Sequence, residues 1–245
     1  MKKLIIANWK MQLGYRASLD LARLYTKQLA GLKNEIVLCP DYLSLPAVSA
    51  ILKKSGLLLG AQDSAASARG AYTGEVSPAD LKALGVKYVI LGHSERREHL
   101  HENSAIINAK IKAALAAGLT PVLCVGEKIA ERESGEARPY LAEELRHALK
   151  GVKIKRASDL VIAYEPVWAI STNKDAKPID AISASDMLGF IQSKAANLLG
   201  KKSRVLYGGS VLSGNAADFS AQPVLDGFLV GGASLKLKDF KIICS

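Results

Sequence analysis

The sequence predicts an α/β protein folded as a closed (β/α)8 barrel, and three observations indicate it. Short apolar runs recur from one end of the 245-residue chain to the other, amphipathic or alanine-rich segments lie between them, and eight such units fill this length. Alternation of strand and helix implies parallel strands joined by right-handed crossovers. An open doubly wound sheet usually has fewer strands and reverses its order once, so the closed barrel is favoured.

The expected elements follow the chain in order. The apolar runs predict strands over residues 4–7, 36–39, 57–60, 88–91, 121–125, 160–164, 204–207 and 228–230. The clearest helical segments are residues 18–29, 47–54, 104–117, 139–150, 182–199 and 214–219. The gap between the third and fourth strands leaves little room for a normal helix, although Ser77 followed by Pro78 can start a short one. A polar loop, residues 62–75, precedes it and is long enough to suggest a function.

Size and composition bound the class of protein. No linker or low-complexity stretch divides the chain, so residues 1–245 are expected to form a single domain. Its apolar stretches fall short of the ~20 residues a membrane helix needs, and no secretion signal is recognisable, so we expect a cytoplasmic protein without a membrane partner. The cysteines, Cys39, Cys124 and Cys244, are odd in number and far apart, which favours free thiols in a reducing compartment.

The net charge of +10 would suit an anionic substrate. Lysines and arginines are nevertheless spread over the whole sequence with acidic residues among them. No basic block and no alternation of basic with aromatic residues indicates a nucleic-acid partner. A solvated basic surface is therefore the favoured interpretation of the charge.

Candidate catalytic side chains stand where strands end. The sixth run stops at Glu165, because Pro166 bars the strand from continuing, and ligands of parallel α/β proteins bind at such ends. The first strand ends in Asn8, Trp9 and Lys10, and alternation places Asn8 and Lys10 on the same side. An ordinary solvated turn remains the alternative for Glu165 when it is taken alone.

His93 follows the fourth strand, and Ser94 after it can open a short helix. Helix N–H groups beside the ring would disfavour the imidazolium, so His93 is expected to be a neutral hydrogen-bond donor. A structural histidine is the alternative. His99 and His101 lie close in sequence, but residues two apart on a helix point to different sides, and neither a His-Glu-x-x-His pattern nor a cysteine pair occurs. No metal site is expected.

Glycine pairs follow the last two strands. Gly208-Gly209-Ser210 and Gly231-Gly232 let backbone N–H groups approach an anion, and barrels often hold a phosphate there. Since no P-loop and no G-x-G-x-x-G pattern occurs, a nucleotide cofactor is not expected. A base, a neutral electrophile, a cation and a phosphate clamp without cofactor suit proton abstraction beside a carbonyl, as in an aldose–ketose isomerisation.

Five segments at strand ends resemble the triosephosphate isomerase family, and the likeness runs through essentially the whole chain. They are residues 8–11, 92–97, 164–170, 207–211 and 227–235. The resemblance implies the TIM barrel fold and interconversion of dihydroxyacetone phosphate and D-glyceraldehyde 3-phosphate through an enediolate. The pairing of a glutamate base with a neutral histidine is the established description of this family. It implies that Glu165 shuttles the proton and His93 polarises the carbonyl. Lys10 would stabilise negative charge, with Asn8 beside it and Glu95 as its partner.

The same resemblance implies a closing lid, residues 166–176, which runs from Pro166 to Ala176. Backbone N–H groups would hold the phosphate at four residues: Ser171, Ser210, Gly231 and Gly232. Tyr207 and Ser210 would latch the closed lid, and Trp168 would exchange partners between Tyr164 and Glu127.

A homodimer is implied as well, with loop 62–75 inserted into the partner subunit. Thr73 would lie near the partner's Asn8 and Lys10, and Glu75 near the partner's Arg96. The chain departs from the family pattern at Ser171 and Asn173, where glycine is usual in the lid, at Asp63, where asparagine is usual, and at Gln12. Serine and asparagine tolerate fewer backbone angles than glycine, so lid motion is a point to test.

Two alternatives stay open at this stage. Another phosphate-binding barrel enzyme, such as a Schiff-base aldolase, would need a desolvated lysine, and Lys10 could be proposed for it. A non-catalytic relative could keep the barrel without its chemistry. The presence of Asn8, Lys10, His93 and Glu165 together favours the isomerase over both.

Overall fold

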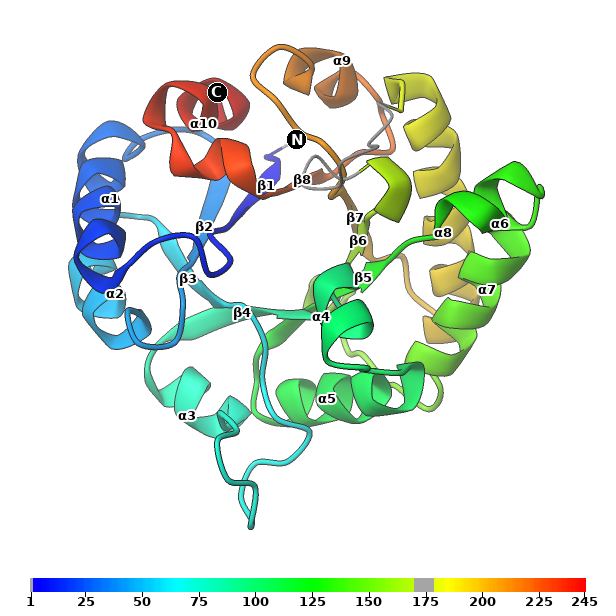
Figure 1. Cartoon of the computed structure of the whole chain (residues 1–245), viewed down its shortest axis with the longest axis horizontal. Coiled ribbons are helices and arrows are strands. Elements are labelled where there is room, and N and C mark those ends of the chain that lie inside the picture. Colours follow the sequence, from blue (N-terminus) through cyan, green and yellow to red (C-terminus); the bar gives the residue numbers. More distant parts are fainter. Residues whose placement is uncertain (1, 170–178) are drawn as a thin grey trace.

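The computed structural model describes residues 2–169 and 179–245, and within them the chain closes an eight-stranded parallel barrel (Figure 1). The strands are β1 Leu4–Asn8, β2 Glu35–Cys39, β3 Leu58–Ala61, β4 Val86–Leu91, β5 Thr120–Val125, β6 Val161–Tyr164, β7 Arg204–Tyr207 and β8 Gly227–Val230. They pair in chain order, and β8 pairs with β1 to close the ring. The expected fold class is confirmed, and each expected strand is found within one or two residues of its place.

Helices surround the barrel in the described residues. They are α1 Tyr15–Gln28, α2 Leu45–Leu52, α3 Pro78–Ala83, α4 Ser94–His99, α5 Ser104–Ala116, α6 Ile129–Glu133, α7 Ala137–Ala148, α8 Ala181–Leu199, α9 Ala216–Ser220 and α10 Leu237–Cys244. The short helix expected at Pro78 is present, and Ser77 caps it by accepting from the N–H of Ala79. The sequence argument did not list α10, which packs Phe240 in a stacked arrangement on Tyr25 of α1.

The strands are buried on both faces, which explains why they read as continuous apolar runs. Alternate side chains fill the inside of the barrel, among them Leu4, Ile6, Val37, Ile90, Val122, Leu206 and Leu229. The intervening side chains point outward and form the larger core beneath the helices. The same alternation decides which side chains reach the open end of the barrel.

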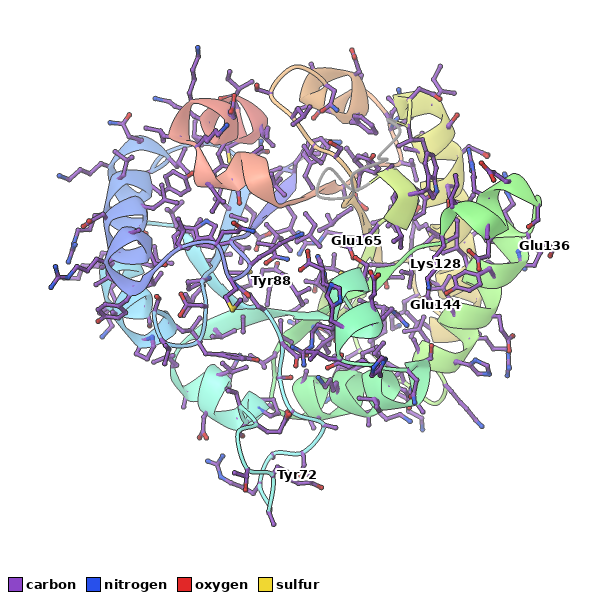
Figure 2. All side chains as sticks on the ribbon, in the orientation of Figure 1. Tyr72, Tyr88, Lys128, Glu136, Glu144 and Glu165 are labelled. Carbon is purple, nitrogen blue, oxygen red and sulfur yellow. The ribbon has the colours of Figure 1, made fainter. Side chains whose placement is uncertain are left out.

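A polar network crosses the end of the barrel where the strands begin. The Glu35 carboxylate accepts from the Tyr88 hydroxyl at 2.8 Å, from Lys87 at 2.7 Å and from Arg204 at 3.1 Å. Arg204 also donates to the Tyr88 hydroxyl at 2.6 Å. Figure 2 shows Tyr88 within the ring of strands. Every oxygen of this carboxylate is therefore engaged, and the network closes the base of the barrel.

The loop between β3 and α3 projects away from the barrel (Figure 1), and Tyr72 lies towards its tip (Figure 2). A hydrogen bond from Ala65 N to Val76 O closes its base, and Arg69 pairs with Asp80 of α3 at 2.7 Å. The loop is thus built as a defined projection. Among the helices that the structure describes, none combines the length and the apolar character needed to cross a bilayer.

Candidate active site

Lys10 stands at the mouth of the barrel in a backbone conformation that the site itself maintains. Its φ of 51° lies in the left-handed region, which costs a non-glycine residue about 1 kcal/mol or more. Its N–H donates to Asn8 Oδ1 at 3.0 Å, and its carbonyl accepts from Gln62 Nε2 at 2.7 Å. Trp9, between them, points the other way and packs edge-on against Tyr25. The expected sharing of one side by Asn8 and Lys10 is confirmed.

The Lys10 ammonium forms an ion pair with Glu95 at 2.5 Å. Burial raises the pKa of Glu95, but the hydrogen bond and charge of Lys10 outweigh it, so the pKa lies below its usual value. Glu95 therefore stays ionised at neutral pH and holds the ammonium in the mouth. Lys10 is directed at the cavity as a fixed cation.

His93 caps helix α4, as the sequence predicts. Its Nδ1 accepts from the backbone N–H of Glu95 at 3.2 Å, so this nitrogen carries no proton. The proton of the neutral ring is then on Nε2, which lies 3.2 Å from Glu165 Oε1. Hydrogen-bond partners thus assign a neutral imidazole whose remaining N–H faces the Glu165 carboxylate.

Glu165 is almost fully buried, with 2% of its surface exposed, yet it has few partners. Besides His93, its carboxylate receives a long 3.4 Å hydrogen bond from the Ser94 N–H. The thiol of Cys124 also contacts it, and burial together with the charge of Glu165 raises the pKa of that thiol. The carboxylate is desolvated and has no lysine or arginine among these three partners, which suits a general base.

A tether behind Glu165 ties neighbouring strand ends together. Arg97 donates to Gly92 O at 2.7 Å and to Cys124 O at 3.1 Å, and it pairs with Glu144 of α7 at 2.9 Å. Figure 2 shows Glu144 and Glu165 on the same side of the barrel. Glu144 also accepts from the N–H of Gly126, where a Cβ would come within 1.8 Å of the Glu165 carbonyl. Only glycine allows this approach.

The glycine loops after β7 and β8 meet the expected catalytic side chains in one cavity. It is lined by Asn8, Lys10, His93, Glu165, Gly208, Gly209, Gly231 and Gly232, among others. Gly231 lies beside the Lys10 side chain, since a Cβ there would meet Lys10 Cε at 3.6 Å. The buried Tyr207 hydroxyl meets the backbone N–H of Ser210. The expected phosphate-binding and latch residues, Ser210 and Tyr207, therefore adjoin the cavity.

The first part of the lid is described and the rest is not. After Pro166, a 3₁₀ turn, Val167–Ala169, places Trp168 Nε1 2.8 Å from Glu127 Oε1. The Tyr164 hydroxyl donates to the same oxygen at 3.0 Å. Of the two partners expected for Trp168, Tyr164 and Glu127, its indole N–H donates to Glu127 in this structure. The lid and phosphate residues Ser171, Asn173 and Ala176 lie outside the described residues.

The residues expected at a dimer contact lie on the projecting loop and beside its root. Thr73 and Glu75 are exposed on the projecting loop. Arg96 pairs with Asp63 at the root of that loop, in a buried cluster that also contains Lys110 and Glu102. Burial raises the pKa of Asp63 to about 6, although Lys110 and Arg96 oppose this.

Sequence reasoning missed Gln62 and the tether of Arg97 to Glu144. Gln62 follows directly on the third strand, so its place at a strand end was the available signal. Arg97 lies in the motif after His93, but besides the nearby Gly92 its partners come from β5 and α7, which are distant in sequence. No group of three or more histidine, cysteine or acidic side chains among the described residues is arranged to hold a metal ion.

Comparison with known proteins decides the family. The family model described as triosephosphate isomerase matches residues 3–245. The chain belongs to the triosephosphate isomerase family. Triosephosphate isomerases from Chloroflexus aurantiacus and Dehalococcoides mccartyi are each 44% identical, over 97% and 100% of this chain and 96% of each relative. The crystal structure of triosephosphate isomerase from Bartonella henselae is similar, with a TM-score of 0.88 at 34% identity, covering 100% of this chain and 98% of that one.

Membership of the triosephosphate isomerase family agrees with the resemblance seen at the strand ends. The match is continuous from β1 to α10 rather than confined to the site. An isomerase of triose phosphates needs a base, an electrophile and an anion site within one cavity. The described part of the chain supplies Glu165, His93 and the two glycine loops there.

Proposed function

We propose that this chain catalyses the interconversion of dihydroxyacetone phosphate and D-glyceraldehyde 3-phosphate, a step of glycolysis and gluconeogenesis, without a cofactor. The observation that carries the proposal is the short contact between Glu165 and the protonated nitrogen of neutral His93. One group can take a proton from carbon while the other donates to oxygen, and both line the same cavity.

In this mechanism Glu165 removes the proton next to the carbonyl and returns it to the neighbouring carbon. His93 polarises the carbonyl through Nε2–H and moves protons between the two oxygens. A neutral imidazole suits this role because its N–H is closer in acidity to the enediol O–H than the N–H of imidazolium is. The low exposure of both side chains strengthens these interactions.

Lys10 stabilises the negative charge that develops on the substrate, and Asn8 and Glu95 orient it. Ser210, Gly231 and Gly232, together with Ser171 of the lid, bind the phosphate through backbone N–H groups. The proximity of Gly231 to Lys10 supports a phosphate lying beside the ammonium. The lid, which begins at Pro166, excludes water so that the enediolate does not lose phosphate.

The chain acts in this proposal as a cytoplasmic, single-domain subunit of a homodimer. The loop 62–75 is exposed over residues 68–75, which include Thr73 and Glu75, and it is the element that would enter the partner. Exposed apolar side chains on the neighbouring loops, Met11 and Leu43, support a buried contact there. Arg96, already held by Asp63, would be ready to meet the partner's Glu75.

The alternative activities fit the site less well. A Schiff-base lysine must be a neutral amine, whereas Lys10 is paired with an ionised Glu95. A non-catalytic relative would have no need of a buried carboxylate left with few partners.

A coupled assay with D-glyceraldehyde 3-phosphate tests the proposal. We expect turnover by the wild type. For Glu165→Gln we expect kcat to fall by about 10²–10⁴-fold or more, which is the usual effect of removing a general base. Phosphate-analogue binding should remain in that variant, because the backbone N–H groups are untouched. Absence of turnover in a correctly folded dimer, or full activity of Glu165→Gln, would refute the assignment.

A further inference from the structure

The end of the barrel opposite the active site is strongly basic. Segments 2–3, 29–34, 53–57, 149–160, 200–203 and 221–226 lead into strands at this end, and they contain eleven lysines and arginines but two acidic residues. Nine exposed lysines are Lys2, Lys33, Lys53, Lys54, Lys150, Lys153, Lys155, Lys201 and Lys202. We call them the base lysines. Along the chain they are dispersed, and only the barrel topology gathers them.

The base lysines have no internal counter-charge in the described residues. The acidic side chains at this end are already engaged, since Asp159 pairs with Arg156, Asp226 accepts from Val205 N, and Glu35 is held in the base network. Six of these nine lysines follow helix C-termini, where a cation is favourable. Lys2, Lys153 and Lys155 have no such role, and grouped like charges repel one another and lower stability.

The base lysines form two arcs on nearly opposite sides of the ring. Four of them lie before the adjacent strands β1, β2 and β3, and five lie before the adjacent strands β6 and β7. The segments between the arcs, 84–85, 117–119 and 221–226, contain only Asp226 as a charged residue. A rod-shaped polyanion lying across the end of the barrel would meet both arcs at once.

The chemistry of this surface favours a sugar-phosphate backbone. None of these segments contains an exposed large apolar or aromatic side chain among the described residues, so the lysine-bearing loops themselves have nothing to insert into a lipid bilayer or to stack on bases. Flexible ammonium groups suit phosphates contacted without sequence readout. We propose that the base lysines bind the backbone of a nucleic-acid duplex, independently of the isomerase site.

The test uses fluorescence anisotropy of the full-length protein with a labelled RNA duplex of about 20 base pairs at several salt concentrations. We expect a Kd of about 1–100 μM near physiological salt, weakening linearly on a log–log plot against salt. Three variants carry four substitutions to Gln each. The first alters Lys2, Lys33, Lys53 and Lys54, and the second alters Lys150, Lys153, Lys201 and Lys202. The third is the matched control near the mouth of the barrel, and it alters Arg16, Lys128, Lys236 and Lys238.

Each base-lysine variant should bind the duplex at least about tenfold more weakly, with a shallower salt dependence, because counterion release falls with each lost phosphate contact. The control should change affinity by less than about threefold. Isomerase turnover of all variants reports correct folding. Equal loss in the control would mean that net charge alone attracts the duplex, and salt-independent binding would contradict backbone contacts. Tighter binding to phosphatidylserine vesicles than to the duplex would assign the surface to lipid. Each of these results overturns the proposal.

Discussion

Each end of the barrel contains a carboxylate that is largely buried, and the two carboxylates have different hydrogen-bond partners. At the base, Glu35 receives hydrogen bonds from Lys87, Tyr88 and Arg204. Burial alone would raise the pKa of Glu35, but these donors outweigh it and lower the pKa to about 2. At the mouth, Glu165 is more deeply buried and meets the His93 nitrogen, the Cys124 thiol and, at 3.4 Å, the Ser94 N–H, with no lysine or arginine among these partners.

This difference separates a structural carboxylate from a reactive one. A carboxylate held by two cations and a hydroxyl is fixed in place, and these donors make it a weak base. One that meets only a neutral ring, a thiol and a long N–H contact can exchange these partners for substrate. The same side-chain chemistry thus stabilises the fold at one end and serves catalysis at the other, and the partners decide which.

The largest effect should come from the mouth. Replacing Lys10 with Met keeps the length of the side chain but removes the charge that faces the developing enediolate. We expect kcat/KM to fall about 10²–10³-fold, the range for one lost electrostatic donor. Urea unfolding should change little, since the ion pair with Glu95 is partly exposed. A variant with normal kcat/KM would show that Lys10 has no part in charge stabilisation.

Much of this arrangement could be predicted from the sequence, because two simple rules place the side chains. Parallel strands bring all their carboxyl ends to one rim, and alternation sets which side chains face inward. These rules place Asn8, Lys10, His93 and Glu165 together, and the structure brings all four to one cavity. The short helix α4, which His93 caps, could also be predicted, from Ser94 and the acidic residue after it.

Other features depend on contacts that no local pattern carries. Gln62 reaches the Lys10 carbonyl across a neighbouring strand, and Arg97 joins the ends of β4 and β5 to α7. To predict such bonds, one must know how far distant strands are shifted relative to one another along the barrel axis, and sequence periodicity does not give this shift. The clustering of the base lysines could not be predicted either, because they are dispersed along the chain and only the folded barrel brings them to one end. The expected roles of Ser171 and Ala176 stay predictions.

An intermediate effect should come from the base. In Glu35→Gln the amide keeps the shape but leaves the cationic partners Lys87 and Arg204 without a counter-charge. We expect the free energy of unfolding at pH 7 to fall by about 2 kcal/mol, with kcat unchanged. The folded pKa of Glu35 is lowered, so its contribution is complete above about pH 5 and is lost as pH falls towards 2.

Urea denaturation across this pH range checks the expectation for Glu35. Wild type should lose stability more steeply than Glu35→Gln on acidification, and the two curves should converge near pH 2. A constant difference at all pH values would mean that the carboxylate charge is not what stabilises the base. A loss of kcat would break the separation between the two ends.

The smallest effect should come from Asp63, which lies between the two extremes. Its Oδ2 meets Lys110 of α5 at 2.7 Å and Arg96 of α4 at 2.8 Å, while its Oδ1 is buried without a partner. Glu102 faces the same two cations and brings a like charge close. Tyr42 is the remaining titratable neighbour. Asp63 therefore has cationic partners, which Glu165 lacks, but shares them with a second acid, which Glu35 does not.

Burial raises the folded pKa of Asp63 to about 6, above its ordinary value of 3.8. The folded protein then binds more protons than the unfolded chain between these values, so the contribution of Asp63 to stability falls as pH rises from about 4 to 6. Asp63→Asn should remove this trend, and its stability relative to wild type should improve by about 1–2 kcal/mol across that window. Urea midpoints of both proteins, measured from pH 4 to 8, give the comparison. Parallel curves would show that folding does not raise the pKa of Asp63, and that sharing its cations with Glu102 carries no cost.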